Sequence, residues 1–316
     1  MPSAFDSSGR DPVWTRTKRW LSPLLNIPRI NALRGVPMPQ LMGDTAQAAI
    51  AAAVARGSSL VARIGETEGR AIGFYHAYRK AAGASPRCSY PPALAHHIKF
   101  GAGYFPTDDA AIDTLARLYL EATAAIDIYA AWTPHDALLI PPRARTCRLI
   151  DLEPMFTRER WTLALAGRRV AVVSPLKDSI EAQYARRERL FDAPTLPDFD
   201  LVAIRAVQTQ CDQDVAGENW HANLDRLDAA VAAASADVVI IGAGAYGLPL
   251  GARAKARGST AVVLGGATQL LFGIMGSRWL TYAGYRALMN DAWIRPAAHE
   301  RPAGYDKLEL AGGAHW

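Results

Sequence analysis

The chain has 316 residues, of which 50% are hydrophobic and 21% charged, a composition typical of a folded domain with a sizeable core. The 35 basic and 30 acidic residues give a formal net charge of +5, which suits an anionic small ligand but is too small and dispersed to indicate nucleic-acid binding. Cys88, Cys147 and Cys211 form no Cys-x-x-Cys pair, which argues against a disulfide framework or structural zinc and favours a reducing compartment.

Residues 1–45 form a basic extension that differs from the rest of the chain. It contains Trp14 and Trp20 and is interrupted by prolines. Two interpretations stay open: a segment draped over the surface, or a peripheral membrane contact in which tryptophans reach the headgroups and basic side chains meet anionic lipid. Because there is no apolar run of about 18 residues and no apolar signal-peptide core, we expect a cytoplasmic protein, with any membrane contact at the inner face.

Strand-like and helix-like segments alternate through the first half of the remaining chain, residues 46–165. The β-rich run at 59–64 predicts a strand, and a helical stretch follows it. Residues 108–126 have apolar residues at helical spacing and begin with two aspartates, which suit a first helical turn. The run at 136–141, DALLIP, predicts another strand.

The second half, residues 166–316, is more regular. Its predicted strands are 168–175, 199–207, 237–242 and 260–266, and its clearest predicted helices are 220–235 and 248–257. Helical crossovers of this length between strands imply a mainly parallel sheet with helices on both faces. The sequence therefore predicts an α/β, Rossmann-like fold built from two β/α halves.

The segment GAGAYG, after the predicted strand at 237–242, has the glycine spacing of a phosphate-binding turn. Gly242 permits a tight turn, Gly244 lets backbone N–H groups approach an anion, and Gly247 permits close helix packing. A dinucleotide site also requires an acidic residue at the end of the next strand, which instead ends in GGATQ, residues 265–269. This disfavours NAD(P) and leaves two alternatives: another phosphate ligand, or glycines that serve only the turns.

The segment RIGETEG follows the first predicted strand and carries Arg63, Gly65, Glu66 and Glu68. In an extended conformation, the spacing of the two glutamates points both carboxylates the same way, and the pair can hold a divalent cation such as Mn²⁺ or Mg²⁺. Inside a helix the carboxylates diverge, and acidic residues in a first turn complement the helix dipole. Both interpretations stay open.

Five segments together resemble a family of bacterial proteins that is associated with polysaccharide biosynthesis and has a GT-D-like glycosyltransferase fold. These segments are RIGETEG, VVSPLKDSIEAQYARRERLF, GAGAYGLPLGARAKARG, GGATQLLFGIMGSRW and NDAWIRP. The resemblance spans about residues 45–316 and is most specific over 242–279. The more distant similarity to the GT-D glycosyltransferases themselves rests mainly on RIGETEG. In those enzymes an Asp-x-Glu motif after an Arg-x-Gly turn helps to bind a metal and a sugar nucleotide.

The resemblance implies a transfer of sugar from a nucleotide-sugar donor to a glycan acceptor in surface polysaccharide biosynthesis. Glu68 matches the glutamate of the motif, whereas Glu66 stands at the aspartate position, where it keeps the charge on a longer side chain. Both become candidate catalytic and metal-binding residues. The candidate contacts to the nucleotide sugar are Arg63, Gly65, Gly242, Gly244, Tyr246, Gly247, Gly265, Gly266, Gln269 and Arg278. The alternatives are an NAD(P)-dependent oxidoreductase and a non-catalytic protein that binds a nucleotide or glycan in a biosynthetic complex.

Overall fold

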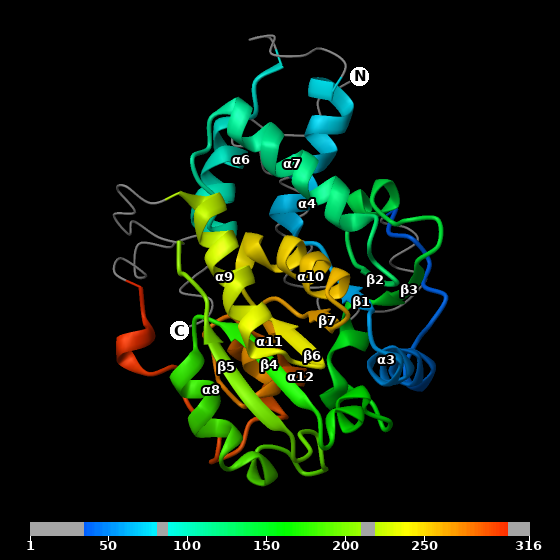
Figure 1. Ribbon diagram of the computed structural model, residues 1–316, viewed down its shortest axis with the longest axis vertical. Coiled ribbons are helices and arrows are strands. Elements are labelled where there is room, and N and C mark those ends of the chain that lie inside the picture. The colour runs from blue at the N-terminus through cyan, green and yellow to red at the C-terminus, as the bar shows by residue number, and fades with distance from the viewer. Residues whose placement is uncertain (1–34, 81–87, 210–218, 303–316) are drawn as a thin grey trace.

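The computed structural model describes residues 35–80, 88–209 and 219–302, and its centre is a seven-stranded sheet (Figure 1). The strand order is β3-β2-β1-β7-β6-β4-β5, and all neighbouring strands are parallel. The strands are β1 (Leu60–Ala62), β2 (Ile128–Ala131), β3 (Arg145–Arg148), β4 (Arg169–Ser174), β5 (Asp200–Arg205), β6 (Val238–Ile241) and β7 (Thr260–Val263). The α/β, Rossmann-like architecture expected from the sequence is confirmed.

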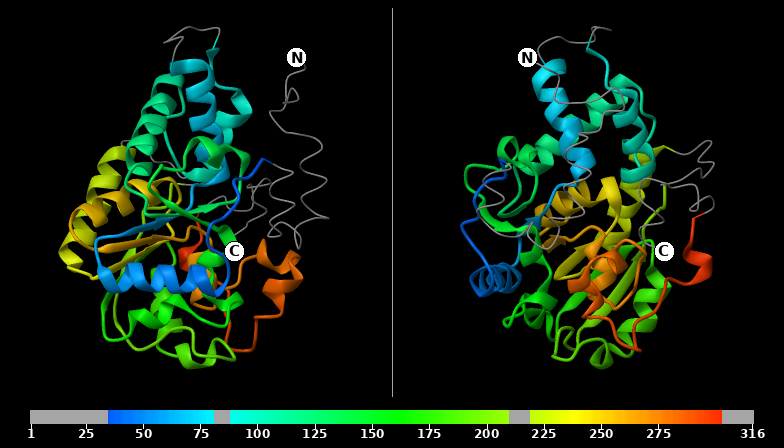
Figure 2. Two further views of the ribbon diagram at one scale, coloured as in Figure 1. Left: turned by 90° about the vertical axis from the view of Figure 1, so that its right-hand side faces the viewer. Right: turned by 180° about the vertical axis from the view of Figure 1, so that it is seen from behind.

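Helices lie on both faces of this sheet (Figures 1 and 2). They are α3 (Asp44–Arg56), α4 (Glu66–Phe74), α6 (Pro92–His97), α7 (Asp109–Thr123), α8 (Lys177–Tyr184), α9 (Trp220–Ala234), α10 (Gly247–Ala256), α11 (Ala267–Leu271) and α12 (Ala283–Arg286). Two of them, α4 and α6, run on into π-helical turns, Tyr75–Arg79 and Ile98–Ala102. The predicted helices at 108–126, 220–235 and 248–257 correspond to α7, α9 and α10.

The core consists of two apolar layers, one on each side of the sheet. Successive strand residues point to opposite faces, so Leu60 and Ala62 join one layer and Val61 the other. The first layer contains α4, α7, α9 and α10, and the second contains α3, α8 and α11. The strands β1, β2, β6 and β7 are buried at every residue, because helices cover both faces of the sheet there.

The two β/α halves meet where β1 pairs with β7, in the register Leu60 to Ala261 and Ala62 to Val263. The chain leaves β1 into α4 on one face of the sheet and leaves β7 into α11 on the other. Adjacent strands whose connections diverge in this way mark the position at which open α/β sheets bind ligands, beyond the carboxyl ends of the strands.

One strand prediction is wrong. Residues 136–141 are not a strand, because a 3-10 turn, Pro134–Leu138, occupies this position. The carboxylate of Asp136 closes the turn by accepting hydrogen bonds from the backbone N–H groups of Trp132 and Thr133, both at 2.7 Å. The strands of this region are β2 and β3 on either side of the turn, and their four-residue lengths gave too short a pattern to recognise.

The basic extension is described only from residue 35, and its first described part lies along the edge of the sheet. Leu41 donates a backbone hydrogen bond to Thr146 of β3 at 2.9 Å, and α3 follows. Trp14 and Trp20 lie outside the described residues, so the membrane contact stays a prediction. Over the described ranges, no helix combines the length and apolar character needed to span a membrane.

Candidate functional site

A group of charged side chains gathers at the carboxyl edge of the sheet around β1. We call it the arginine–glutamate cluster; its members are Arg63, Glu68, Glu153 and Arg278. Arg63 directly follows β1, and Glu68 lies in the first turn of α4. Glu153 follows the 3-10 turn after β3, and Arg278 immediately precedes another 3-10 turn, Trp279–Thr281. Arg63 interacts electrostatically with the other three members, so the fold brings together three segments that are distant in the sequence.

Gly265, at the end of β7, makes room for Arg63. A Cβ on this glycine would overlap Nη2 of Arg63 and lie 2.6 Å from its Cζ, and the glycine has a left-handed φ of +60°. The guanidinium also lies 5.9 Å from the ring centre of Trp132, whose indole N–H donates to the carbonyl of Ile64 at 2.8 Å. The glycine after β7 therefore accommodates the arginine after β1.

Gly65 does the same for Glu68. A Cβ on Gly65 would overlap Oε2 of Glu68 and lie 2.7 Å from its Cδ. Glu68 is 8% exposed, and its carboxylate accepts a hydrogen bond from its own backbone N–H. Burial raises the pKa of Glu68, and the positive charge of Arg63 opposes this rise; burial lowers the pKa of Arg63, and Glu68 opposes that change. The two groups therefore support each other's charged forms.

Glu153 is the most buried member of the cluster, with 4% of its surface exposed. The hydroxyl of Tyr285 donates to its Oε2 at 2.8 Å. Burial raises the pKa of Glu153 to about 7, against the opposing effects of that hydrogen bond, Arg63 and Arg278. Sequence reasoning missed this residue because the segment LEPMF contains no spacing motif and Glu153 meets the others only in the fold.

Aromatic side chains adjoin the cluster. The ring centres of Trp279 and Phe156 lie 5.0 and 5.1 Å from that of Tyr285, and the guanidinium of Arg278 lies 5.0 Å from the centre of Trp279. The indole N–H of Trp279 is buried and has no hydrogen-bond partner among the described residues. A buried donor without a partner, close to the Arg278 guanidinium, suits a ligand with oxygen acceptors.

The glycine turns after β6 and β7 pack against each other. A Cβ on Gly242 would lie 2.6 Å from Oγ1 of Thr268 and 2.8 Å from the carbonyl oxygen of Gly265. The backbone N–H groups of Gly242 and Gly265 already donate within the sheet edge, to Val173 at 2.8 Å and Ile241 at 3.1 Å. These two N–H groups are therefore occupied, and the guanidinium groups of Arg63 and Arg278 are the charged donors that the cluster offers to an anion.

The remaining glycine candidates differ in their surroundings. Gly244 is exposed and has a φ of +53°, and Gly266 follows Gly265 just before α11. Gly247 lies at the start of α10, where a Cβ would be 3.2 Å from Val263. Gly247 thus serves the close packing of helix against strand that its position in the motif predicts.

Two further candidates have buried side chains that pack within the protein. Tyr246 is 2% exposed and stacks on Trp220, with ring centres 4.6 Å apart and an interplanar angle of 7°. Gln269 is 3% exposed and donates to the carbonyl of Ile274 at 3.2 Å. These contacts give both side chains a role in packing and turn structure.

Glu66 and Glu68 both lie in the first turn of α4, two residues apart in a helix. Residues at this separation do not face each other. Their electrostatic partners differ accordingly: Glu66 acts on His135, which Arg70 also approaches, whereas Glu68 acts on Arg63. The extended spacing needed for a shared cation is not present, so the pair does not fit the divalent-cation site implied by the resemblance.

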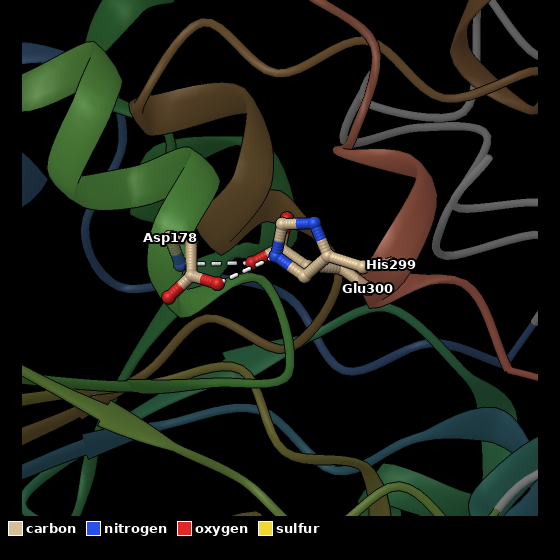
Figure 3. A group of neighbouring side chains, drawn as sticks. All are labelled: Asp178, His299 and Glu300. Atoms are coloured by element: carbon tan, nitrogen blue, oxygen red, sulfur yellow. Dashed lines mark hydrogen bonds and ion pairs between the residues drawn. The ribbon is translucent and has the colours of Figure 1, made fainter.

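Among the described residues, the group with metal-ligand spacing is Asp178, His299 and Glu300 (Figure 3). His299 Nε2 lies 2.6 Å from Oδ2 of Asp178, and Arg205 is 2.7 Å from the same oxygen. Glu300 accepts from the backbone N–H groups of Asp178 and Ser179, at 2.8 and 3.3 Å, and from the Ser179 hydroxyl. We call these residues, with Arg205, the cap cluster, because Glu300 caps the N-terminus of α8. The positive charge that a metal ion would bring to Asp178 is provided by Arg205.

No protein-family model, curated protein or solved structure matches this chain. The fold and the site define an α/β protein with an arginine–glutamate cluster at the carboxyl edge of a parallel sheet.

Proposed function

We propose that the protein is a glycosyltransferase that transfers a sugar from a nucleotide-sugar donor to a glycan acceptor. The observation that carries the proposal is the meeting of Arg63 and Arg278 with two buried carboxylates beyond β1 and β7. The diphosphate of a nucleotide sugar is bound by guanidinium groups through charge-assisted hydrogen bonds. The transfer to the acceptor hydroxyl uses a carboxylate as a base. The arginine–glutamate cluster offers both.

Arg63 and Arg278 would stabilise the leaving diphosphate. Its negative charge grows as the bond to the sugar breaks, and donors held in place beforehand stabilise that charge without reorganising. Arg63 is held in place by Gly265 and Glu68, whereas Arg278 is exposed and approaches from the surface. Arg63 would fix the position of the diphosphate, and Arg278 would bind it from the surface side.

The resemblance to GT-D-like proteins of polysaccharide biosynthesis supports the same reaction class. It suggests a surface glycan as acceptor. The reaction would take place in the cytoplasm, with the basic extension of residues 1–45 as a peripheral contact to the inner face of the membrane. Because Glu66 and Glu68 diverge on α4, the proposal assigns charge neutralisation to the arginines and gives no step to a divalent cation.

Calorimetric titration of the full chain tests the proposal. UDP-glucose, GDP-mannose, a CMP-sugar and NADH are each titrated, in EDTA and then in MnCl₂, into wild type and Arg63→Lys. We expect saturable binding of a sugar nucleotide that Arg63→Lys weakens, since lysine cannot reproduce the planar guanidinium fork. Tight binding of NADH without a response to any sugar nucleotide would support the oxidoreductase instead, and sugar-nucleotide binding without any turnover would support the non-catalytic alternative.

A further inference from the structure

A transfer that inverts the anomeric centre needs a base to take the proton of the acceptor hydroxyl. We propose that Glu153 is this base and hence a catalytic residue, an inference that rests on the proposed function. It stands on the hydrogen bond of the buried side chain with Tyr285, on its electrostatic interaction with Arg63 and Arg278, and on the contrast with Glu68.

One oxygen of the Glu153 carboxylate accepts a hydrogen bond, and the other accepts none from the described residues. Oε2 accepts the hydroxyl of Tyr285 at 2.8 Å, and the described residues provide no further hydrogen bond to this carboxylate. Tyr285 is half-buried and Arg278 is exposed, so the groups around Glu153 extend from the interior to the surface. Oε1 is thus the atom that would receive a proton, with Tyr285 as the positioning residue.

The electrostatic surroundings suit a base that works near neutral pH. Burial raises the pKa of Glu153 to about 7, while the Tyr285 hydrogen bond, Arg63 and Arg278 limit the rise. A general base is most effective when its pKa lies close to the operating pH, because it is then ionised and still a good proton acceptor.

Glu68 differs in the direction of its carboxylate. Its Oε2 turns back over Gly65, and the carboxylate accepts its own backbone N–H in the first turn of α4. In that position Glu68 supports the charge of Arg63. The inference therefore gives Glu68 a positioning role and assigns proton transfer to Glu153.

The proposed step is a single displacement at the anomeric carbon. The acceptor oxygen attacks the anomeric carbon as its proton moves to Oε1 of Glu153. The bond from that carbon to the diphosphate oxygen breaks, and its electron pair leaves with the diphosphate, where Arg63 and Arg278 stabilise the charge. The products are the glycoside of inverted configuration, the nucleoside diphosphate and a protonated Glu153, which returns the proton to water.

Glu153→Gln tests the inference in the full chain, because it keeps the shape of the side chain and removes the base. UDP-glucose and GDP-mannose serve as donors and water as acceptor, and release of the nucleoside diphosphate is followed from pH 5 to 9. We expect kcat to fall about 10²- to 10⁴-fold, with the Kd for the donor unchanged. The wild-type rate should rise with pH through about 7, and the variant should lose this dependence.

Two further measurements separate proton transfer from a structural role. Azide attacks without giving up a proton, so sodium azide should restore diphosphate release in Glu153→Gln, with formation of an inverted glycosyl azide. Tyr285→Phe removes a hydrogen bond that lowers the pKa of Glu153, and should move the rising limb of the pH profile to higher pH. A loss of packing alone would lower the rate without moving this limb.

The outcomes distinguish the inference from the proposed function. Failure of wild type to bind any sugar nucleotide removes both. Binding with diphosphate release that Glu153→Gln retains, at the wild-type rate and pH profile, overturns the assignment of Glu153 and leaves the glycosyltransferase standing. Donor binding by wild type without diphosphate release also overturns the assignment, since no proton is then transferred.

Discussion

The arginine–glutamate cluster and the cap cluster both lie where strands end, but their carboxylates are satisfied to different degrees. In the cap cluster, Glu300 accepts from two backbone N–H groups and a hydroxyl, and Asp178 is bound by His299 and Arg205. In the arginine–glutamate cluster, Glu153 is equally buried, and within the described part of the chain its carboxylate accepts one hydrogen bond, from Tyr285. Buried charge that is fully hydrogen-bonded stabilises the fold, whereas buried charge that is only partly satisfied indicates a functional site.

The two clusters also respond to pH with opposite sign. Hydrogen bonds from His299 and Arg205 lower the pKa of Asp178 below its ordinary 3.8, so its stabilising effect is present above that pH and is lost as the pH falls. Burial raises the pKa of Glu153 from 4.5 to about 7, so the folded protein keeps a proton there that the unfolded chain has lost. Stability therefore falls as the pH rises from 4.5 through 7.

The largest expected effect is on stability at high pH. Glu153→Gln removes the carboxylate that is ionised in a buried position above pH 7, and should raise the free energy of unfolding at pH 8 by up to about 3 kcal/mol. Near pH 4.5, where both chains are neutral at this position in the fold, the difference should be small. Urea unfolding at the two pH values measures it, and equal destabilisation at both would contradict a raised pKa.

The next effect concerns Gly265, with a matched control elsewhere in the chain. Gly265 and Gly167 have similar left-handed φ angles, +60° and +69°, but a Cβ meets Arg63 only at Gly265 and meets nothing within 4 Å at Gly167. Changing either to alanine should cost about 1 kcal/mol or more of stability through backbone strain. Only Gly265→Ala should displace the guanidinium and raise the Kd for a sugar nucleotide, by about 10- to 100-fold. Equal Kd values for Gly265→Ala and Gly167→Ala would contradict a role of Gly265 in positioning Arg63 for the ligand.

Glu300→Gln tests the cap cluster. The amide keeps one acceptor but turns its NH₂ group toward donors, so α8 loses part of its N-terminal cap. We expect a loss of about 1 to 2 kcal/mol in the free energy of unfolding, with unchanged affinity for the sugar nucleotide. A substantial loss of affinity would show that the cap cluster takes part in ligand binding after all.

The smallest effect is expected for Arg278, which is exposed. Arg278→Ala should raise the Kd for the sugar nucleotide about 3- to 10-fold at low salt, and the difference should shrink as salt screens the charge. Arg286→Ala, at another exposed arginine in α12, is the control and should leave the Kd unchanged. An equal response of both variants would indicate a general effect of net charge.

The fold could be predicted largely from the sequence, because β4, β6 and β7 are buried on both faces and appear as apolar runs. The short strands β2 and β3 could not, since four residues carry little pattern and a polar side chain, Asp136, shaped the segment between them. For the site, Arg63, Gly65, Gly265 and Arg278 were identified because they lie in or beside glycine turns. Glu153 was missed, since burial and a distant tyrosine give it its properties.

The contact between Arg63 and Gly265 has a consequence for folding. Arg63 follows β1, the first strand along the chain, and Gly265 follows β7, the last strand along the chain. Their contact therefore requires β1 to pair with β7, and this pairing joins the two strands that are farthest apart in the sequence. Contacts so distant along the chain form late, because the entropy of loop closure opposes them. A partly folded chain therefore lacks the complete cluster, and a ligand that binds it would stabilise only the fully assembled sheet, in proportion to RT ln(1 + [L]/Kd).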